Sequence, residues 1–173
     1  MQFTAVLRTI NEMKQAGVID HYAIGRAVGA TFYLEPIATL DIDIFVNFAT
    51  VPGQLLASPR PIFDFMLARG AVAKGEYLIV EGWPVQFLPP PSLLCEEALL
   101  QATEKRVDSI PVWVFSAEHL AAIALETGRP KDKARLLQFI ESGILDAEKF
   151  GRIVESYLLS AKWQQFQRQF LEP

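Results

Sequence analysis

The sequence predicts one α/β (α+β) domain, in which a mixed sheet is flanked by helices and followed by a C-terminal helical extension. Three observations predict this class. Short apolar runs alternate with helical segments as far as residue 115, two of these runs form a hairpin pattern, and residues 116–173 have helical periodicity throughout. At 173 residues and 51% hydrophobic, the chain can bury a sizeable core. We therefore expect an α/β core over 1–115 and a helical region over 116–173 packed on it.

The first half of the chain predicts alternating helices and strands. They are, in order, a helix over 3–15, a strand over 22–24, a helix over 27–33, a strand in DIDIFV (41–46), a helix over 59–67 and a hairpin made by EYLIV (76–80) and WPVQFLP (83–89). Ser58 is the expected N-cap of the third helix, with Pro59 at its first position. The Glu81–Gly82 pair supplies the hairpin turn.

The second half predicts one more helix and strand and then helices only. A helix is expected over 93–104 and a strand in IPVWVFS (110–116). Ser116 caps the next helix, which Gly128 ends, and three further helices follow, the second of them capped by Asp146. Apolar residues recur at helical spacing in these last segments, which indicates core or a dimer surface.

Composition excludes several classes. A net charge of −4 argues against general nucleic-acid binding. Every apolar run is too short to span a bilayer, and the N-terminus lacks the pattern of a secretory signal. The single cysteine, Cys95, allows no internal disulfide, so we expect a cytoplasmic protein. His21 and His119 are too far apart in sequence to suggest a histidine-ligated metal.

The segment GRPKDKAR is the densest basic cluster. Arg129 and Lys131 lie in it with a single acid, Asp132. The simpler interpretation is a solvated loop and helix start. The alternative is a local site for an anion on an otherwise acidic chain.

Two carboxylates interrupt the apolar strand DIDIFV. Asp41 and Asp43 are two residues apart, so on a strand they point to one face while Ile42 and Ile44 point to the other. Two adjacent carboxylates repel unless a cation lies between them, and Mg²⁺ is commonly held by such a pair together with water and phosphate oxygens. The alternative is that both acids lie at an exposed strand end and pair with bases such as Arg26.

A glycine precedes this strand at a strand-to-helix turn. Gly25 follows the apolar run ending at Ile24 and opens the segment over 27–33. Glycine lets backbone approach a phosphate, and a helix N-terminus favours negative charge. The segment therefore predicts a phosphate site next to a metal-binding pair.

These motifs resemble the nucleotidyltransferase superfamily, which has the polymerase-beta-like fold, and in particular its bacterial stand-alone branch with the toxins of abortive-infection systems. The family pattern, an apolar residue, Gly, Gly or Ser, then Asp-x-Asp, corresponds to Ile24-Gly25-Arg26 and Asp41-Ile42-Asp43. Thr39, Glu35-Pro36 and the GRPKD junction also resemble this branch. The resemblance covers residues 22–137.

The resemblance implies binding of a nucleoside triphosphate with Mg²⁺ and transfer of its nucleotidyl group to an unknown acceptor. Asp41 and Asp43 would be the catalytic and metal-binding residues. Gly25, Arg26, Thr39, Arg129 and Lys131 would contact the nucleotide or its phosphates.

Three positions depart from the family pattern. Arg26 replaces a small residue, Gln86 stands where a third acid is expected, and Ala124 stands where toxin relatives have a lysine. Glu76 or Glu81 could substitute for the missing acid. Three alternatives follow. The protein is an active nucleotidyltransferase, or a catalytically inactive module that binds a nucleotide or a protein in a toxin–antitoxin or phage-defence setting, or a D-x-D glycosyltransferase fragment. Homodimerisation is left open.

Overall fold

One mixed sheet forms the centre of the molecule in the computed structural model, which describes residues 2–36, 39, 41–50 and 52–173. Its seven strands follow the order β3-β4-β5-β2-β1-β7-β6. They are β1 Tyr22–Ile24, β2 Ile42–Val46, β3 Val72–Lys74, β4 Tyr77–Val80, β5 Trp83–Leu88, β6 Thr103–Val107 and β7 Ile110–Val114. Strand β2 pairs in parallel with β5 and antiparallel with β1, and β1 pairs in parallel with β7.

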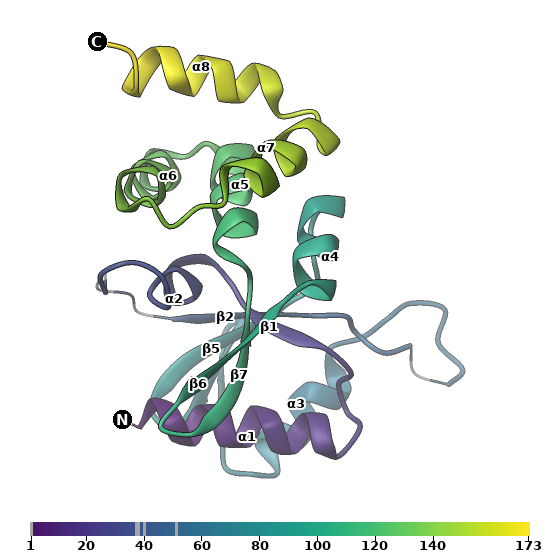
Figure 1. Cartoon of the computed structure of the whole chain (residues 1–173). Helices are drawn as coiled ribbons and strands as arrows, with labels where there is room; N and C mark the ends of the chain where they lie inside the picture. Colours follow the sequence, from purple (N-terminus) through teal and green to yellow (C-terminus); the bar gives the residue numbers. More distant parts are fainter. Residues whose placement is uncertain (1, 37–38, 40, 51) are drawn as a thin grey trace.

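The helices divide between the two faces of this sheet. They are α1 Phe3–Gln15, α2 Arg26–Ala30, α3 Arg60–Leu67, α4 Leu93–Leu100, α5 Ala117–Thr127, α6 Pro130–Ser142, α7 Ala147–Ser156 and α8 Ser160–Phe170. In Figure 1, α1 and α3 lie below the sheet, and α4 to α8 rise above it. No helix in the described part of the chain is both long and apolar enough to cross a membrane.

Strand β2 supplies buried side chains to both faces. Ile42, Ile44 and Val46 belong to the lower apolar cluster, with the buried side of α1 and α3. Phe45 belongs to the upper cluster instead. The alternation of side chains along a strand therefore directs Asp43 to the same upper face as Phe45.

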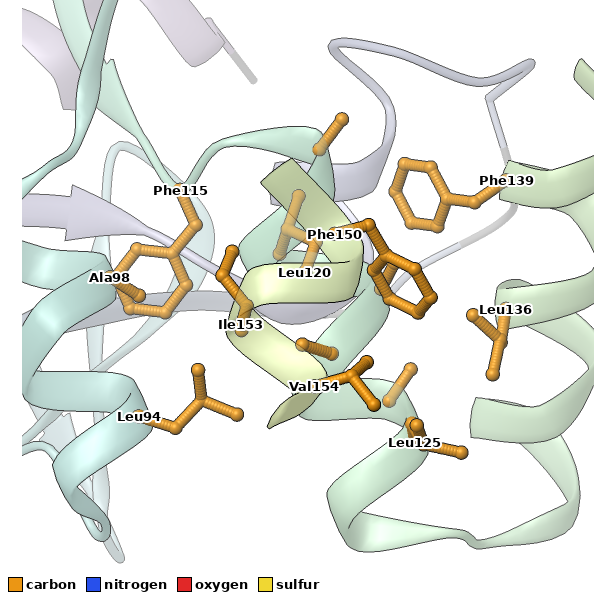
Figure 2. Packing of buried hydrophobic residues seen from close by; sticks show 14 of the residues in the cluster. Leu94, Ala98, Phe115, Leu120, Leu125, Leu136, Phe139, Phe150, Ile153 and Val154 are labelled. Atoms are coloured by element: carbon orange, nitrogen blue, oxygen red, sulfur yellow. The ribbon is translucent and has the colours of Figure 1, made fainter. Parts of the chain in front are cut away.

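The upper core joins the sheet to the C-terminal helices. Ala23 and Phe45 from the sheet belong to the same buried cluster as residues of α4, α5, α6, α7 and α8. Figure 2 shows Leu136 and Phe139 pointing from α6 toward Phe150 of α7. Because Leu136 and Phe139 are fully buried, their packing fixes α6 relative to the sheet.

Most of the predicted elements are confirmed. Helix α1, strand β1 and the β4–β5 hairpin lie where the sequence predicts them. Ser116 accepts a hydrogen bond from the amide of His119, Asp146 accepts one from Lys149, and Gly128 ends α5 in the left-handed conformation. The predicted α/β class with a helical extension is thus correct.

Two strands and several boundaries differ from the prediction. Helix α4 ends at Leu100, and the residues expected to continue it begin β6, which forms a hairpin with β7. Asp108 and Ser109 both have positive φ and form its turn. The short exposed edge strand β3 was also missed. Helix α2 ends at Ala30 rather than at Tyr33, and α3 begins at Arg60 rather than at Pro59.

Candidate functional site

Asp43 is a buried carboxylate near the middle of the sheet. Only 6% of the residue is exposed. Nη1 of Arg26 lies 3.3 Å from its Oδ1 atom. The backbone amide of Gly25 donates a hydrogen bond to the Asp43 carbonyl oxygen at 3.1 Å. The glycine turn after β1 and the acidic strand therefore lie side by side, as the sequence predicts.

The turn at Gly25 requires glycine for steric reasons. A Cβ atom at this position would lie 2.6 Å from Cε2 of Phe45. Arg26 follows with φ of +50°, a left-handed conformation that L-residues other than Asn and Asp rarely adopt. Helix α2 has only five residues, so its N-terminus contributes little positive potential to the predicted phosphate site. The full positive charge at this turn comes from Arg26 itself.

Several charges act on the Asp43 carboxyl group. Burial raises the pKa of Asp43 above its ordinary value, and the charge of Asp41 raises it further. The positive charges of Arg26 and Lys131 lower this pKa, which brings both cations within electrostatic reach of the carboxylate. Asp41, Arg26 and Lys131 thus all act electrostatically on the Asp43 carboxylate.

Asp41 and Thr39 lie just before β2. Asp41 is partly exposed, and its charge contributes, after burial, to a raised pKa of Tyr77 at the start of β4. Tyr77, a residue that the sequence did not single out, therefore lies within electrostatic reach of Asp41. The Thr39 hydroxyl donates a hydrogen bond to the Asp41 carbonyl oxygen at 3.2 Å.

Gln86 stands beside Asp43 on the neighbouring strand. The parallel pairing of β2 with β5 matches Asp43 to Gln86, and residues matched in this way point to the same face. The position next to Asp43 thus carries a neutral amide. Glu76 and Glu81 are exposed and flank β4, one in each turn, so neither belongs to the β2–β5 pair.

A buried aspartate organises the basic cluster. Asp132 is 2% exposed and accepts hydrogen bonds from Arg129 and, at 2.9 Å, from the Thr127 hydroxyl. Arg135 lies 3.6 Å from its other oxygen atom. Asp132 therefore holds two arginines at the start of α6. Arg129, Asp132 and Arg135 are each three residues apart, a spacing that brings side chains together on a helix. This spacing is the sequence signal that predicts the roles of Asp132 and Arg135.

A pocket of about 290 Å³ lies between the sheet and helices α4, α5 and α6. Phe45 and Phe115 form part of its apolar wall, with ring centroids 5.0 Å apart. Its polar lining includes Arg26, Arg129, Arg135 and Glu126. Ala124, where a lysine was expected by resemblance, also lines it. An apolar pocket with a few convergent charges is the usual form of a small-molecule site.

The carboxylates of Asp41 and Asp43 are oxygen donors of the kind that Mg²⁺ prefers. Asp43 already contacts Arg26. The partner of Asp43 on the neighbouring strand β5 is Gln86, which has a neutral amide in place of a carboxylate. Among the described residues, no group of three or more His, Cys, Asp or Glu side chains could hold a metal ion. An ion at Asp41 and Asp43 would need further oxygen ligands from a bound phosphate.

His119 lies outside this site. It is fully buried, its Nδ1 atom lies 2.7 Å from Ser116 Oγ, and its Nε2 atom lies 3.7 Å from the Glu97 carboxylate. Cys95 is a buried wall residue of the pocket, and burial raises the pKa of its thiol. These environments favour structural roles for both side chains.

Comparison with known proteins defines the fold. No protein-family model matches the sequence, and no curated protein matches it significantly. Solved structures do match. One is an antigenic nucleotidyltransferase-like protein from Paracoccidioides brasiliensis, with a TM-score of 0.54, 14% identity and coverage of 92% of this chain and 90% of that one.

ANT(2″)-Ia is similar in two independent structures. The complex with adenylyl-2″-tobramycin gives a TM-score of 0.54 at 14% identity, covering 94% of this chain and 97% of that one. The solution structure of this antibiotic-resistance factor gives 0.53 at 12% identity, with 96% and 97% covered. The chain therefore has a nucleotidyltransferase-like fold over nearly its whole length. The glycosyltransferase alternative finds no support here.

Proposed function

We propose that this protein binds a nucleoside triphosphate, with its phosphates beside Arg26, Arg129 and Lys131 and its base in the adjoining pocket. The observation that carries the proposal is the contact between buried Asp43 and Arg26 where Arg26 lines the pocket. A buried carboxylate with a raised pKa is typical of functional sites. The aromatic wall of the pocket provides a surface against which a base can stack.

One of the fold neighbours holds a nucleotide-derived ligand. ANT(2″)-Ia binds adenylyl-2″-tobramycin, a molecule that carries an adenylyl group. Identity to it is only 14%, so this comparison alone carries the fold and no more. The support for a ligand in this chain therefore rests on its own arginines, acids and pocket.

Asp41 and Asp43 are the residues that would hold Mg²⁺, together with oxygens of the triphosphate. The ion would offset phosphate charge, as magnesium does in other nucleotide sites. We further propose that nucleotidyl transfer is absent or very slow, because Gln86 lies beside Asp43 where a third carboxylate would be needed to hold a second ion. The protein then acts through binding rather than through turnover.

Calorimetric titration tests the binding proposal. Wild-type protein is titrated with ATP, CTP, GTP and UTP in Mg²⁺, alongside Lys131→Glu and Arg129→Gln/Lys131→Glu. We expect at least one nucleotide to bind, and the variants to weaken binding, more strongly at low salt. Arg152→Glu on the exposed side of α7 is the control. No heat of binding with any nucleotide, or affinity unchanged in the double variant, would contradict the proposal.

A transfer assay with radiolabelled nucleotide tests the second part. The acceptor is supplied by cell extract, and wild type is compared with Asp43→Asn. We expect no transfer above background from either protein. Robust transfer by wild type that Asp43→Asn abolishes would instead show an active enzyme.

A further inference from the structure

Arg26 is the cation in direct contact with the buried acid of the site. Its guanidinium contacts Oδ1 of Asp43 and lies 5.7 Å from the Phe45 ring centroid. Arg129 and Arg135 are instead paired with Asp132. Arg26 thus lies where a metal ion bound to Asp43 would need to approach.

The backbone at Arg26 indicates that this contact is maintained at a cost. A φ of +50° is unfavourable for arginine relative to the right-handed region. Strained backbone persists where surrounding contacts stabilise it, and it is concentrated at functional sites. Glycine would adopt this conformation freely, yet the chain has a long cationic residue here.

The Arg26 side chain can also reach a ligand. Its exposed fraction is 40%, compared with 8% for the Asp43 side chain, and it lines the pocket. A guanidinium has five N–H donors in a planar fork, so one edge can contact a carboxylate while another contacts a phosphate. The geometry therefore allows one residue to bridge Asp43 and a bound triphosphate.

We propose that Arg26 is a built-in counter-cation which replaces much of the contribution of Mg²⁺ to nucleotide affinity. This inference rests on the proposed nucleotide binding. With Arg26 beside Asp43, the triphosphate does not need a metal ion to approach the buried carboxylate. Mg²⁺ can enter with the nucleotide, but binding then depends only weakly on it.

Titration with and without metal tests this inference. The nucleotide that binds wild type most tightly is titrated in Mg²⁺ and in EDTA into wild type, Arg26→Ser, Arg26→Lys and the control Arg152→Ser. We expect the Kd of wild type and of the control to change less than about threefold on removal of Mg²⁺. In EDTA, Arg26→Ser should bind about tenfold or more weakly than wild type, because a charge-assisted contact is lost.

Metal should compensate for the missing side chain. In Mg²⁺, Arg26→Ser should regain most of its affinity, and Arg26→Lys should fall between Ser and wild type in EDTA. Circular dichroism and thermal unfolding establish that each variant is folded. If Arg26→Ser is not folded, Arg26→Gly replaces it, because glycine adopts the left-handed conformation without strain.

Different outcomes would overturn the role of Arg26 and nucleotide binding itself. Loss of wild-type affinity by more than about tenfold in EDTA would overturn the role of Arg26 while leaving nucleotide binding intact. So would equal metal dependence in wild type and Arg26→Ser. No binding by wild type in either buffer would instead overturn the proposed function.

Discussion

Asp43 and Gln86 lie opposite each other on adjacent parallel strands, β2 and β5. The pair puts one buried carboxylate beside one amide in the centre of the upper face. An acid at position 86 would place two carboxylates side by side, an arrangement that repels without a cation. This relationship is the basis of our proposal that Mg²⁺ binds here only together with a phosphate.

Replacing Gln86 by Glu or Asp should create a metal site that wild type lacks. Without metal, the new carboxylate should raise the pKa of Asp43 further and lower thermal stability. Mg²⁺ alone should then raise the Tm of Gln86→Glu or Gln86→Asp but not that of wild type, because a ligand that binds the folded state stabilises it. Thermal unfolding with and without Mg²⁺ measures this. Gln138→Glu, on the exposed side of α6, is the control, and an equal shift in it would refute a specific site.

Asp43→Asn should leave the protein as stable as wild type at pH 7, or more stable. The pKa of Asp43 is raised mainly by burial, so the folded state disfavours the charged form. Such a group contributes stability below its unfolded pKa of about 3.9, and this contribution is lost as pH rises through the folded pKa. A gain of about 1 kcal/mol would raise Tm by roughly 2–4 °C.

The measurement is thermal unfolding of Asp43→Asn between pH 3 and 8. The higher thermal stability of Asp43→Asn relative to wild type should disappear at the acid end of this range. Asp64→Asn is the control, since the Asp64 side chain is 67% exposed. A clear loss of stability at pH 7 would mean that the contact with Arg26 outweighs the burial of the charge.

Stability should fall as pH drops below about 6.5 because of His119. Burial lowers the pKa of His119, against the raising effect of Glu97 on α4; Lys149 lowers it further and Glu118 raises it. The unfolded chain therefore binds a proton more readily than the folded one, and acid favours unfolding.

Urea unfolding of His119→Gln at pH 8 and pH 5.5 measures this dependence. The variant should be less stable than wild type at pH 8, because it loses the buried contact with Ser116, and should lose less stability on acidification. His21→Gln, at an exposed position, should behave like wild type. An acid-induced loss identical in wild type and His119→Gln would assign the effect to other groups.

Leu136→Ala should destabilise the fold by about 2–5 kcal/mol. Leu136 is fully buried where α6 packs on the upper core, and its removal leaves a cavity. The same change at Leu55, which is fully exposed, should alter stability by about 0.5 kcal/mol or less. Equal effects in denaturant unfolding would show that α6, and with it the arginines at its start, is not held by this packing.

The sequence predicts the local part of this architecture well, since its signals are local. Caps such as Ser116 and the period-two pattern of DIDIFV depend on neighbouring residues, and they gave correct elements. Strand β6 was missed because Thr103 and Glu104 continue the helical pattern of α4. Only pairing with β7 makes this polar edge segment a strand.

In the candidate site, too, local features could be predicted from the sequence and features set by tertiary packing could not. The proximity of Gly25 to the acidic strand could be predicted from the spacing of the motif. The pairing of Arg129 with Asp132, and the position of Tyr77 beside Asp41, depend on how α6 and β4 pack, which no local pattern contains. The contact of Arg26 with Asp43 was foreseen only as one alternative, because a long side chain at a turn can point into the site or out of it.

The proposed nucleotide site can be examined in a crystal structure with a non-hydrolysable analogue of the tightest-binding nucleotide. We expect phosphate oxygens within hydrogen-bond distance of the Arg26 guanidinium, with Asp43 still beside it and the base against Phe45 or Phe115. A nucleotide bound elsewhere on the molecule, with the Arg26–Asp43 contact and the pocket unchanged, would contradict the proposal.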